Sequence, residues 1–175
     1  NFIDDNFDDE QELGDITKLN KLPFKVDLIV GGVPCQSWSV AGKMEGFDDP
    51  RGKLWGDTIR VVEKNQPRAF IFENVKGLFD PRNRKNLELI RISFEKAGYD
   101  VFPPQLLNSY DFGVPQNRDR IFIVGLRKDI QDKKRFSYPK SLNKHMTIQE
   151  VLDLPGVSSK NTIKKKFDPK DIHGE

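Results

Sequence analysis

The feature that most constrains the fold is an apolar run that closes the segment Phe24–Gly32 and stops at two glycines. A continuous apolar run of this length is typical of a β-strand that is buried on both faces. Ala69–Phe72 and Ile121–Leu126 are two more short apolar runs, and Tyr99–Leu107 predicts a further strand that two consecutive prolines interrupt. The chain therefore offers four candidate strands.

Helical patterns separate these strands. Apolar residues recur near helical spacing between Leu54 and Val62, and the pattern stops before Pro67, where a helix is disfavoured. Asn86–Ala97 predicts a second helix with one apolar face, and Gly98 stands where a helix commonly ends in a left-handed residue.

Strands that alternate with helices predict an α/β fold with a mostly parallel sheet. The strand Ile121–Leu126 starts from the loop that follows Tyr99–Leu107, so it must run back antiparallel to the others. Thr147–Glu150 is a capping box that predicts a short helix closed by Pro155. Residues 1–155 are thus expected to form one domain, and the polar, lysine-rich residues 156–175 a linker or the start of another region.

The cysteine content and the charge distribution bear on the cellular environment of the protein and on its contacts. The chain has one cysteine, which excludes an internal disulfide and predicts a reducing, cytoplasmic environment. Residues 127–170 hold twelve Lys/Arg against five acids. Such a basic end supplies either phosphate contacts or an ordinary solvated surface, and charge alone does not decide between them.

The cysteine is the first chemical signal. Cys35 directly follows the first apolar strand and a Gly-Gly-Val-Pro turn. In open α/β sheets ligands bind at the carboxyl ends of the strands, so Cys35 is expected to face a cleft. A free cysteine more often serves only as a buried packing residue. The polar segment Gln36–Ser39 that follows Cys35 argues against this packing role here.

A carboxylate and two arginines are the second and third signals. Glu73 follows the strand Ala69–Phe72, one strand–helix–strand unit after Cys35, so two neighbouring parallel strands would bring both side chains to one edge. Arg118 and Arg120 precede the antiparallel strand and would reach the same edge. The simpler interpretations are that Glu73 is a solvated surface residue and that the two arginines form surface salt bridges. The expected convergence of all four residues at one edge favours a catalytic site.

At these segments the sequence resembles the cytosine-5 DNA methyltransferases. Pro34–Gln36, Glu73–Val75 and the Gln-x-Arg-x-Arg pattern of Gln116–Arg120 match the family's motifs in the family's order. Ser39–Gly52 resembles the family's mobile loop after the catalytic cysteine, and Gly14–Thr17 is similar to a segment on the cofactor side. The resemblance covers roughly residues 10–155 and implies the Rossmann-like fold of methyltransferases that depend on S-adenosylmethionine.

The resemblance implies that S-adenosylmethionine donates a methyl group to carbon 5 of a flipped cytosine in double-stranded DNA, without a metal. Cys35 would attack carbon 6 as a thiolate, and Arg118 would supply the positive field that favours the thiolate. Glu73, if protonated, would donate to ring N3 and offset the charge that develops on the base, and Arg120 would complete the catalytic set. The expected cofactor contacts are Asp15, Ile16, Pro34 and Leu54, and the expected DNA contacts are Gln36, Ser39, Lys43 and Arg51.

The chain also departs from the family. No glycine-rich turn precedes Asp15, and a target-recognition domain and closing motifs would be expected after residue 155. We therefore expect a piece of a full-length enzyme, in preference to a split subunit or a truncated relative, with a partial cofactor site. Three alternatives remain open: a tRNA-methylating relative, a non-catalytic regulatory module, and a cysteine hydrolase. Both histidines lie far from Cys35, which argues against the hydrolase and against zinc.

Overall fold

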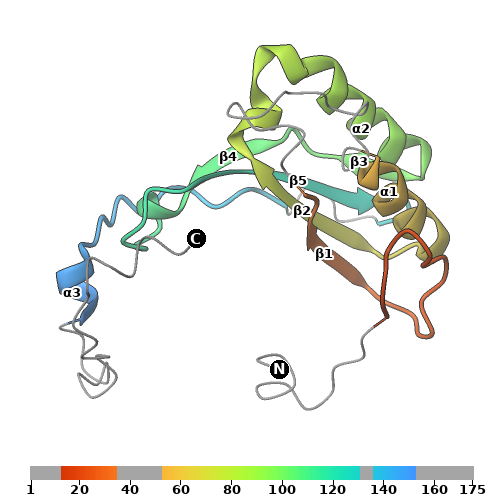
Figure 1. Cartoon of the computed structure of the whole chain (residues 1–175), viewed down its shortest axis with the longest axis horizontal. Helices are drawn as coiled ribbons and strands as arrows, with labels where there is room; N and C mark the ends of the chain where they lie inside the picture. Colours follow the sequence, from red (N-terminus) through yellow and green to blue (C-terminus); the bar gives the residue numbers. More distant parts are fainter. Residues whose placement is uncertain (1–12, 35–52, 131–135, 153–175) are drawn as a thin grey trace, which may run out of the picture. The chain divides into compact units, whose positions relative to one another are not determined.

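The computed structural model describes residues 13–34, 53–130 and 136–152. The chain divides into two compact units, the first formed by Asn1–Asn108 with Arg118–Lys140 and the second by Ser109–Asn117 with Ser141–Glu175. The sheet and the two longer helices belong to the first unit, and a short helix belongs to the second (Figure 1).

The first unit combines one mixed sheet with helices. Its strands are β1 (Leu28–Gly32), β2 (Ala69–Val75), β3 (Tyr99–Val101), β4 (Gln105–Asn108) and β5 (Asp119–Arg127). Its helices are α1 (Leu54–Asn65) and α2 (Arg84–Lys96), and the 3-10 turns η2 (Lys76–Phe79) and η3 (Pro81–Asn83) connect β2 to α2.

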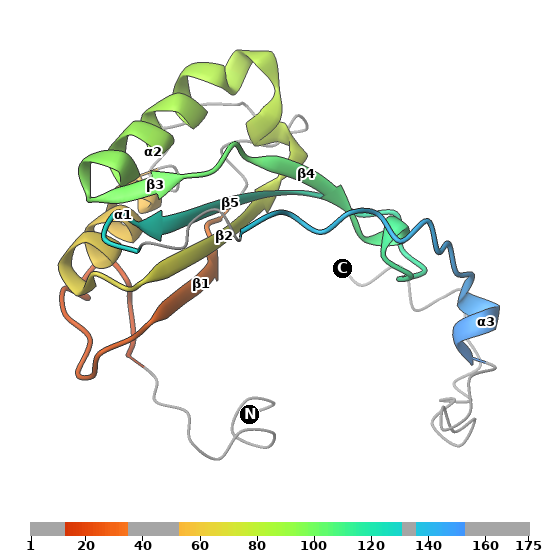
Figure 2. The ribbon, with the colours of Figure 1, turned by 180° about the vertical axis from the view of Figure 1, so that it is seen from behind.

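The strand order is β1-β2-β5-β3, with β4 also paired to β5. β1 and β2 are parallel, and β5 is antiparallel to β2, β3 and β4. In the described sheet β5 therefore runs against the common direction of the other four strands, as Figure 2 shows for β2 and β5. The prediction of a mostly parallel direction with one reversed strand is confirmed.

The core lies between the sheet and the two helices, which pack on the same face of it (Figure 1). Phe70 of β2 stacks on Phe94 of α2 with ring centroids 4.2 Å apart. Phe72 meets Trp55 of α1 edge-on at 6.0 Å. Side chains alternate along a strand, so Phe70 and Phe72 face the helices while Glu73 faces the opposite side of the sheet.

The helix ends follow the sequence signals closely. α1 ends at Asn65, and Gln66 adopts the left-handed conformation with φ 47° directly before Pro67. α2 ends just before Gly98, whose φ is +100°, as predicted. α2 begins at Arg84, two positions before the predicted start, because the Asp80 side chain accepts a hydrogen bond from the Arg82 N–H and leads the chain through η3 into the helix.

Two strand predictions need correction. The first strand is shorter than Phe24–Gly32, and it is not buried on both faces, because the side chains of Leu28 and Val30 are 49% and 64% exposed in the described structure. The second strand is longer than Ala69–Phe72, because its pairing with β5 continues as far as Val75. Glu73 therefore lies within β2 and does not follow it.

In the second unit, the predicted capping box is present at the start of α3 (Ile148–Leu152). Glu150 Oε2 accepts a hydrogen bond from the Thr147 N–H at 2.6 Å, and the Glu150 N–H donates to Thr147 Oγ1 at 3.2 Å. Pro155 and residues 156–175 lie outside the described residues, so the domain boundary at residue 155 stays a prediction.

Candidate active site

The candidate site lies at the carboxyl ends of β1 and β2. Gly32, the last residue of β1, pairs with Glu73 of β2. The chain then continues through Val33 and Pro34, which are the last described residues before Cys35. Cys35, Gln36, Ser39, Lys43, Arg51 and the loop Ser39–Gly52 that holds the last three lie outside the described residues, so their roles stay predictions.

Glu73 lies close to the two predicted arginines. Arg120 Nε lies 2.5 Å from Glu73 Oε1, and the nearest guanidinium nitrogen of Arg118 lies 3.9 Å from the same oxygen. The Glu73 side chain is 35% exposed and that of Arg118 is 49% exposed. The structure therefore brings together three of the four predicted catalytic residues in an open cluster of one carboxylate and two cations.

The antiparallel register explains this geometry. Arg120 is paired with Val75, two positions along β2 from Glu73. Residues two apart share a face of a strand, and diagonal neighbours across a pair are within reach of long side chains. Gly32 leaves room for the carboxylate from the β1 side, since a Cβ there would lie 3.3 Å from Glu73 Oε2.

A second carboxylate holds the arginine segment in place. Asp119, between the two arginines, accepts hydrogen bonds from Lys76 Nζ and Asn108 Nδ2, both at 2.9 Å. Asn108 Oδ1 in turn accepts from the Arg118 N–H at 3.3 Å. The hydrogen bond from Lys76 is the main reason why the pKa of Asp119 is lower than its usual value. This network ties the ends of β2 and β4 to the start of β5.

Asn74 links β2 to the segment that leads into Cys35. Its side chain is 1% exposed, and its Nδ2 donates to the Val33 carbonyl at 3.0 Å. Its Oδ1 accepts from the Val75 N–H at 2.9 Å. Buried amide groups need such partners. The sequence does contain a signal for this residue, because a polar side chain stands where the alternating pattern of β2 predicts an apolar core residue. The sequence gives no signal for its partner, the Val33 carbonyl.

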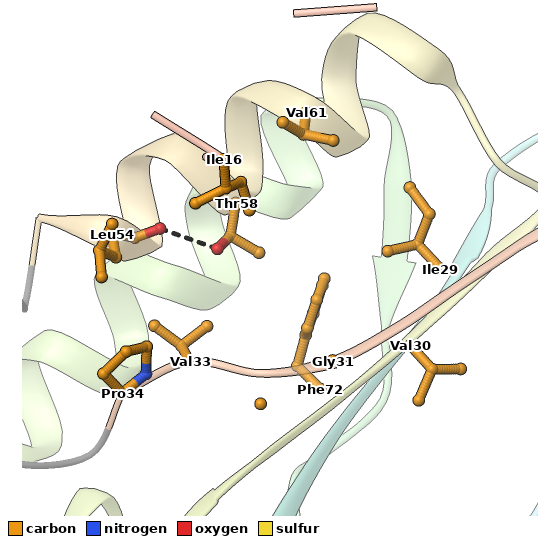
Figure 3. Close-up of a pocket in the computed structure, with 11 residues that line it drawn as sticks. Ile16, Ile29, Val30, Gly31, Val33, Pro34, Leu54, Thr58, Val61 and Phe72 are labelled. Atoms are coloured by element: carbon orange, nitrogen blue, oxygen red, sulfur yellow. Dashed lines mark hydrogen bonds between the residues drawn. The ribbon is translucent and has the colours of Figure 1, made fainter. Parts of the chain in front are cut away.

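A cavity of about 240 Å³ opens between β1 and α1 (Figure 3). Ile16, Pro34 and Leu54, three of the four predicted cofactor contacts, line it. The remaining lining residues are Ile29, Val30, Gly31, Gly32, Val33, Thr58, Val61 and Phe72. The wall is mostly apolar, and the Thr58 hydroxyl donates to the Leu54 carbonyl at 2.8 Å within α1.

The cavity is smaller than the pockets that enclose a whole drug-sized ligand. Such pockets measure roughly 300–1,000 Å³, so this cavity of about 240 Å³ has room for part of a ligand of that size. Asp15, the fourth predicted contact, is exposed and adjoins Ile16 in sequence. Its carboxylate accepts from the Thr17 N–H at 2.9 Å, which is the main cause of its lowered pKa, and it offers an ionised acceptor.

Among residues 13–34, 53–130 and 136–152, no cluster of three histidine, cysteine, aspartate or glutamate side chains is placed to bind a metal ion. In the same residues no helix has the length and apolar character needed to cross a membrane.

Comparisons with known proteins identify the family of the chain. The family model described as C-5 cytosine-specific DNA methylase matches residues 2–174. The chain is 57% identical over 144 residues to the Type II methylase M.HgiEI of Herpetosiphon aurantiacus, which covers 82% of this chain and 32% of the relative. It is 39% identical over 147 residues to the Type II methyltransferase M.HpaII of Haemophilus parainfluenzae, covering 83% and 41%.

A solved structure shows the same fold. The crystal structure of a DNA modification methyltransferase encoded within an E. coli prophage superposes with a TM-score of 0.59 at 28% identity, covering 82% of this chain and 41% of that one. The described sheet and helices thus form part of the Rossmann-like methyltransferase fold. The chain belongs to the C-5 cytosine-specific DNA methylase family. It spans about a third of the length of the Herpetosiphon relatives.

Proposed function

We propose that this protein transfers a methyl group from S-adenosylmethionine to carbon 5 of cytosine in double-stranded DNA, through a covalent bond between Cys35 and a flipped base. The observation that carries the proposal is the cluster that Glu73 forms with Arg118 and Arg120, because Glu73 lies on β2, the strand next to the one that leads into Cys35. The description of the matching family model, C-5 cytosine-specific DNA methylase, supports DNA as the substrate.

The reaction needs a nucleophile because carbon 5 of cytosine does not react readily with a methyl donor. Attack of the Cys35 thiolate on carbon 6 forms a carbon–sulfur bond and makes carbon 5 electron-rich. After methyl transfer, carbon 5 loses its proton and the carbon–sulfur bond breaks, which restores the ring and the thiolate. Nearby positive charge stabilises a thiolate, and Arg118 is the half-exposed cation proposed to provide it.

Glu73 is proposed to contact the base. A protonated carboxyl group at this place would donate a hydrogen bond to ring N3 and offset the charge that develops during attack. Until a base arrives, Arg120 holds the carboxylate in a fixed orientation through its 2.5 Å ion pair. A bound base would compete with Arg120 for Glu73, so the arginine prepares the geometry without blocking it.

The cavity between β1 and α1 is proposed to hold S-adenosylmethionine, which when bound supplies the electrophilic methyl group. Ile16 and Leu54 would pack on the adenine ring, and the Asp15 carboxylate would accept a hydrogen bond from the nucleoside. Pro34 lines the same cavity one residue before Cys35, so the cofactor and the nucleophile would approach each other at this point of the chain.

DNA contacts are proposed for Gln36, Ser39, Lys43 and Arg51. The cations Lys43 and Arg51 and the neutral polar side chains of Gln36 and Ser39 can bind phosphate oxygens and set the position of the protein on the duplex. The target base must leave the helix to reach a pocket at the sheet edge, which costs about a few kcal/mol. Contacts to the DNA phosphates on both sides of the flipped base would offset that cost.

Covalent trapping tests the proposal. The full-length protein is incubated with S-adenosylmethionine and a duplex in which 5-fluorocytosine replaces every cytosine of one strand, so that no target sequence has to be chosen. Fluorine on carbon 5 cannot leave as a proton does, so the adduct should persist under denaturing electrophoresis. Cys35→Ser should form none, because a neutral hydroxyl is a far weaker nucleophile. Equal trapping by Cys35→Ser, or none by the unaltered protein, would overturn the proposal.

A further inference from the structure

Helix α1 presents two different sets of side chains on neighbouring faces. Leu54, Thr58 and Val61 follow helical spacing and line the cavity. Asp57 and Arg60, three residues apart, form an ion pair of 2.9 Å on the adjoining face. Arg60 is not among the cavity residues, yet its contacts lead directly to one of the walls.

Arg60 binds a segment that precedes β1. Its guanidinium donates to the carbonyl oxygens of Ile16 at 2.9 Å, Thr17 at 3.2 Å and Leu19, and to Asn20 Oδ1 at 2.8 Å. Four acceptors on five consecutive residues thus converge on one side chain, which is 27% exposed. Hydrogen bonds from a charged donor are roughly twice as strong as neutral ones.

The bound segment has little other regular structure to hold it. It lies outside the strands and helices and forms a turn in which the Lys18 N–H donates to the Asp15 carbonyl at 3.0 Å. Asn65, at the other end of α1, fixes the residues that follow by donating to the Asn20 carbonyl at 3.1 Å. The path of the segment is therefore set mainly from α1, and mostly by Arg60.

The consequence reaches the cavity through Ile16. The Ile16 side chain lines the cavity together with Leu54 and Thr58 (Figure 3). The backbone carbonyl of the same residue is one of the Arg60 acceptors. Loss of this bond would free the wall that carries Ile16 and its neighbour Asp15, and the cavity would lose its fixed width.

We propose that Arg60 is a positioning residue for the cofactor cavity: it holds the Asp15–Ile16 wall against α1 and thereby sets the affinity for S-adenosylmethionine without contacting it. The inference rests on the proposed function of the cavity. A lysine cannot replace Arg60, because an ammonium group is a compact point charge, whereas the planar guanidinium offers five donors in a fixed fork.

The test compares Arg60→Lys with a matched control, Arg91→Lys. Arg91 is also helical and partly exposed, but it pairs with Glu88 and Glu95 on the outer surface of α2. In the full-length protein, calorimetric titration gives the Kd for S-adenosylhomocysteine, and steady-state kinetics give separate KM values for S-adenosylmethionine and DNA. We expect Arg60→Lys to weaken binding about tenfold or more, equivalent to about 1.4 kcal/mol. The KM for S-adenosylmethionine should rise in parallel while that for DNA is unchanged.

Asp57→Asn is a second variant with a milder effect. It removes the carboxylate that orients Arg60 from the helix side, and loss of one partly exposed ion pair leaves the fold intact. We expect a smaller loss of S-adenosylhomocysteine affinity in the same direction, and none for Arg91→Lys.

The outcomes separate the two proposals. If the unaltered protein binds S-adenosylhomocysteine, and Arg60→Lys and Asp57→Asn bind it with the same Kd, Arg60 is not a positioning residue. The proposed function of the cavity then stands. If affinities for cofactor and DNA fall together with the thermal midpoint, Arg60 only supports the fold and the inference is wrong. If the unaltered protein does not bind S-adenosylhomocysteine, the proposed function of the cavity fails and the inference falls with it.

Discussion

Arg120 Nε lies 2.5 Å from Glu73 Oε1, and the register of β5 against β2 is what brings them together. Arg120 is opposite Val75, so it shares a face with Glu73 and reaches it diagonally. A slip of one residue would move Arg120 to the other face of the sheet, where α1 and α2 pack. The candidate active site thus depends on a pairing between distant parts of the chain.

Glu73→Gln should lower turnover more than DNA affinity, because the proposed hydrogen bond strengthens as charge develops on the base. The glutamine amide is a weaker donor than a protonated carboxyl group, and complete loss of one such donor, which costs about 2.7–4 kcal/mol or about 10²–10³ in kcat, is the upper bound of the effect. Turnover at saturating DNA and the Kd for DNA are measured separately. Glu88→Gln on the surface of α2 is the control and should change neither. A collapse of DNA affinity with normal turnover would assign Glu73 a binding role.

Asn74→Ala should impair both stability and covalent trapping. The variant leaves the Val33 carbonyl without the donor that it has from Asn74, and an unsatisfied buried group costs about 1–3 kcal/mol. The same change releases the chain two residues before Cys35, so the rate of 5-fluorocytosine trapping should fall. Denaturant unfolding and trapping kinetics measure the two effects. Trapping at the normal rate in the folded variant would mean that Asn74 serves the core alone.

Lys76→Met should raise the pKa of Asp119, because the hydrogen bond from Lys76 is the largest cause of its depression below 3.8. A carboxylate whose pKa is lowered by folding stabilises the native state above its ordinary pKa, and this contribution disappears as the pH falls through the lowered value. Near neutral pH, Lys76→Met should therefore have a lower free energy of unfolding than the unaltered protein, because it loses part of this contribution. Titration of the Asp119 carboxyl carbon by NMR gives the pKa directly, with Lys85→Met as control. An unshifted Asp119 pKa in Lys76→Met contradicts the assignment.

Gly125→Ala and Gly56→Ala should change stability in opposite directions. A Cβ at Gly125 in β5 would overlap the Phe70 ring, and overpacking of a core costs about 1–3 kcal/mol. A Cβ at Gly56 in α1 meets no atom within 4 Å, and alanine in place of glycine stabilises a helix by about 0.5–1 kcal/mol. Denaturant unfolding of both variants checks the signs. Equal stabilities would show that the β2–β5 contact relaxes without cost.

The local elements could be predicted from the sequence because their signals are local. The apolar run at Ala69 starts β2, Pro67 stops α1, and Gly98 ends α2 with φ +100°. The reversed direction of β5 also followed from the order of strands and loops alone. The motifs that contain Glu73 and the two arginines predicted one edge of the sheet, and the ion pairs lie there.

Tertiary structure decided the contacts that the motifs do not encode. It selected Arg120 as the close partner of Glu73 and left Arg118 at 3.9 Å, gave Asn74 its bond to Val33, and directed Arg60 to the segment beside Ile16. It also left Val30 exposed in a strand predicted to be buried on both faces. Periodicity along a chain determines which residues share a face, but register and packing between distant segments determine what that face meets.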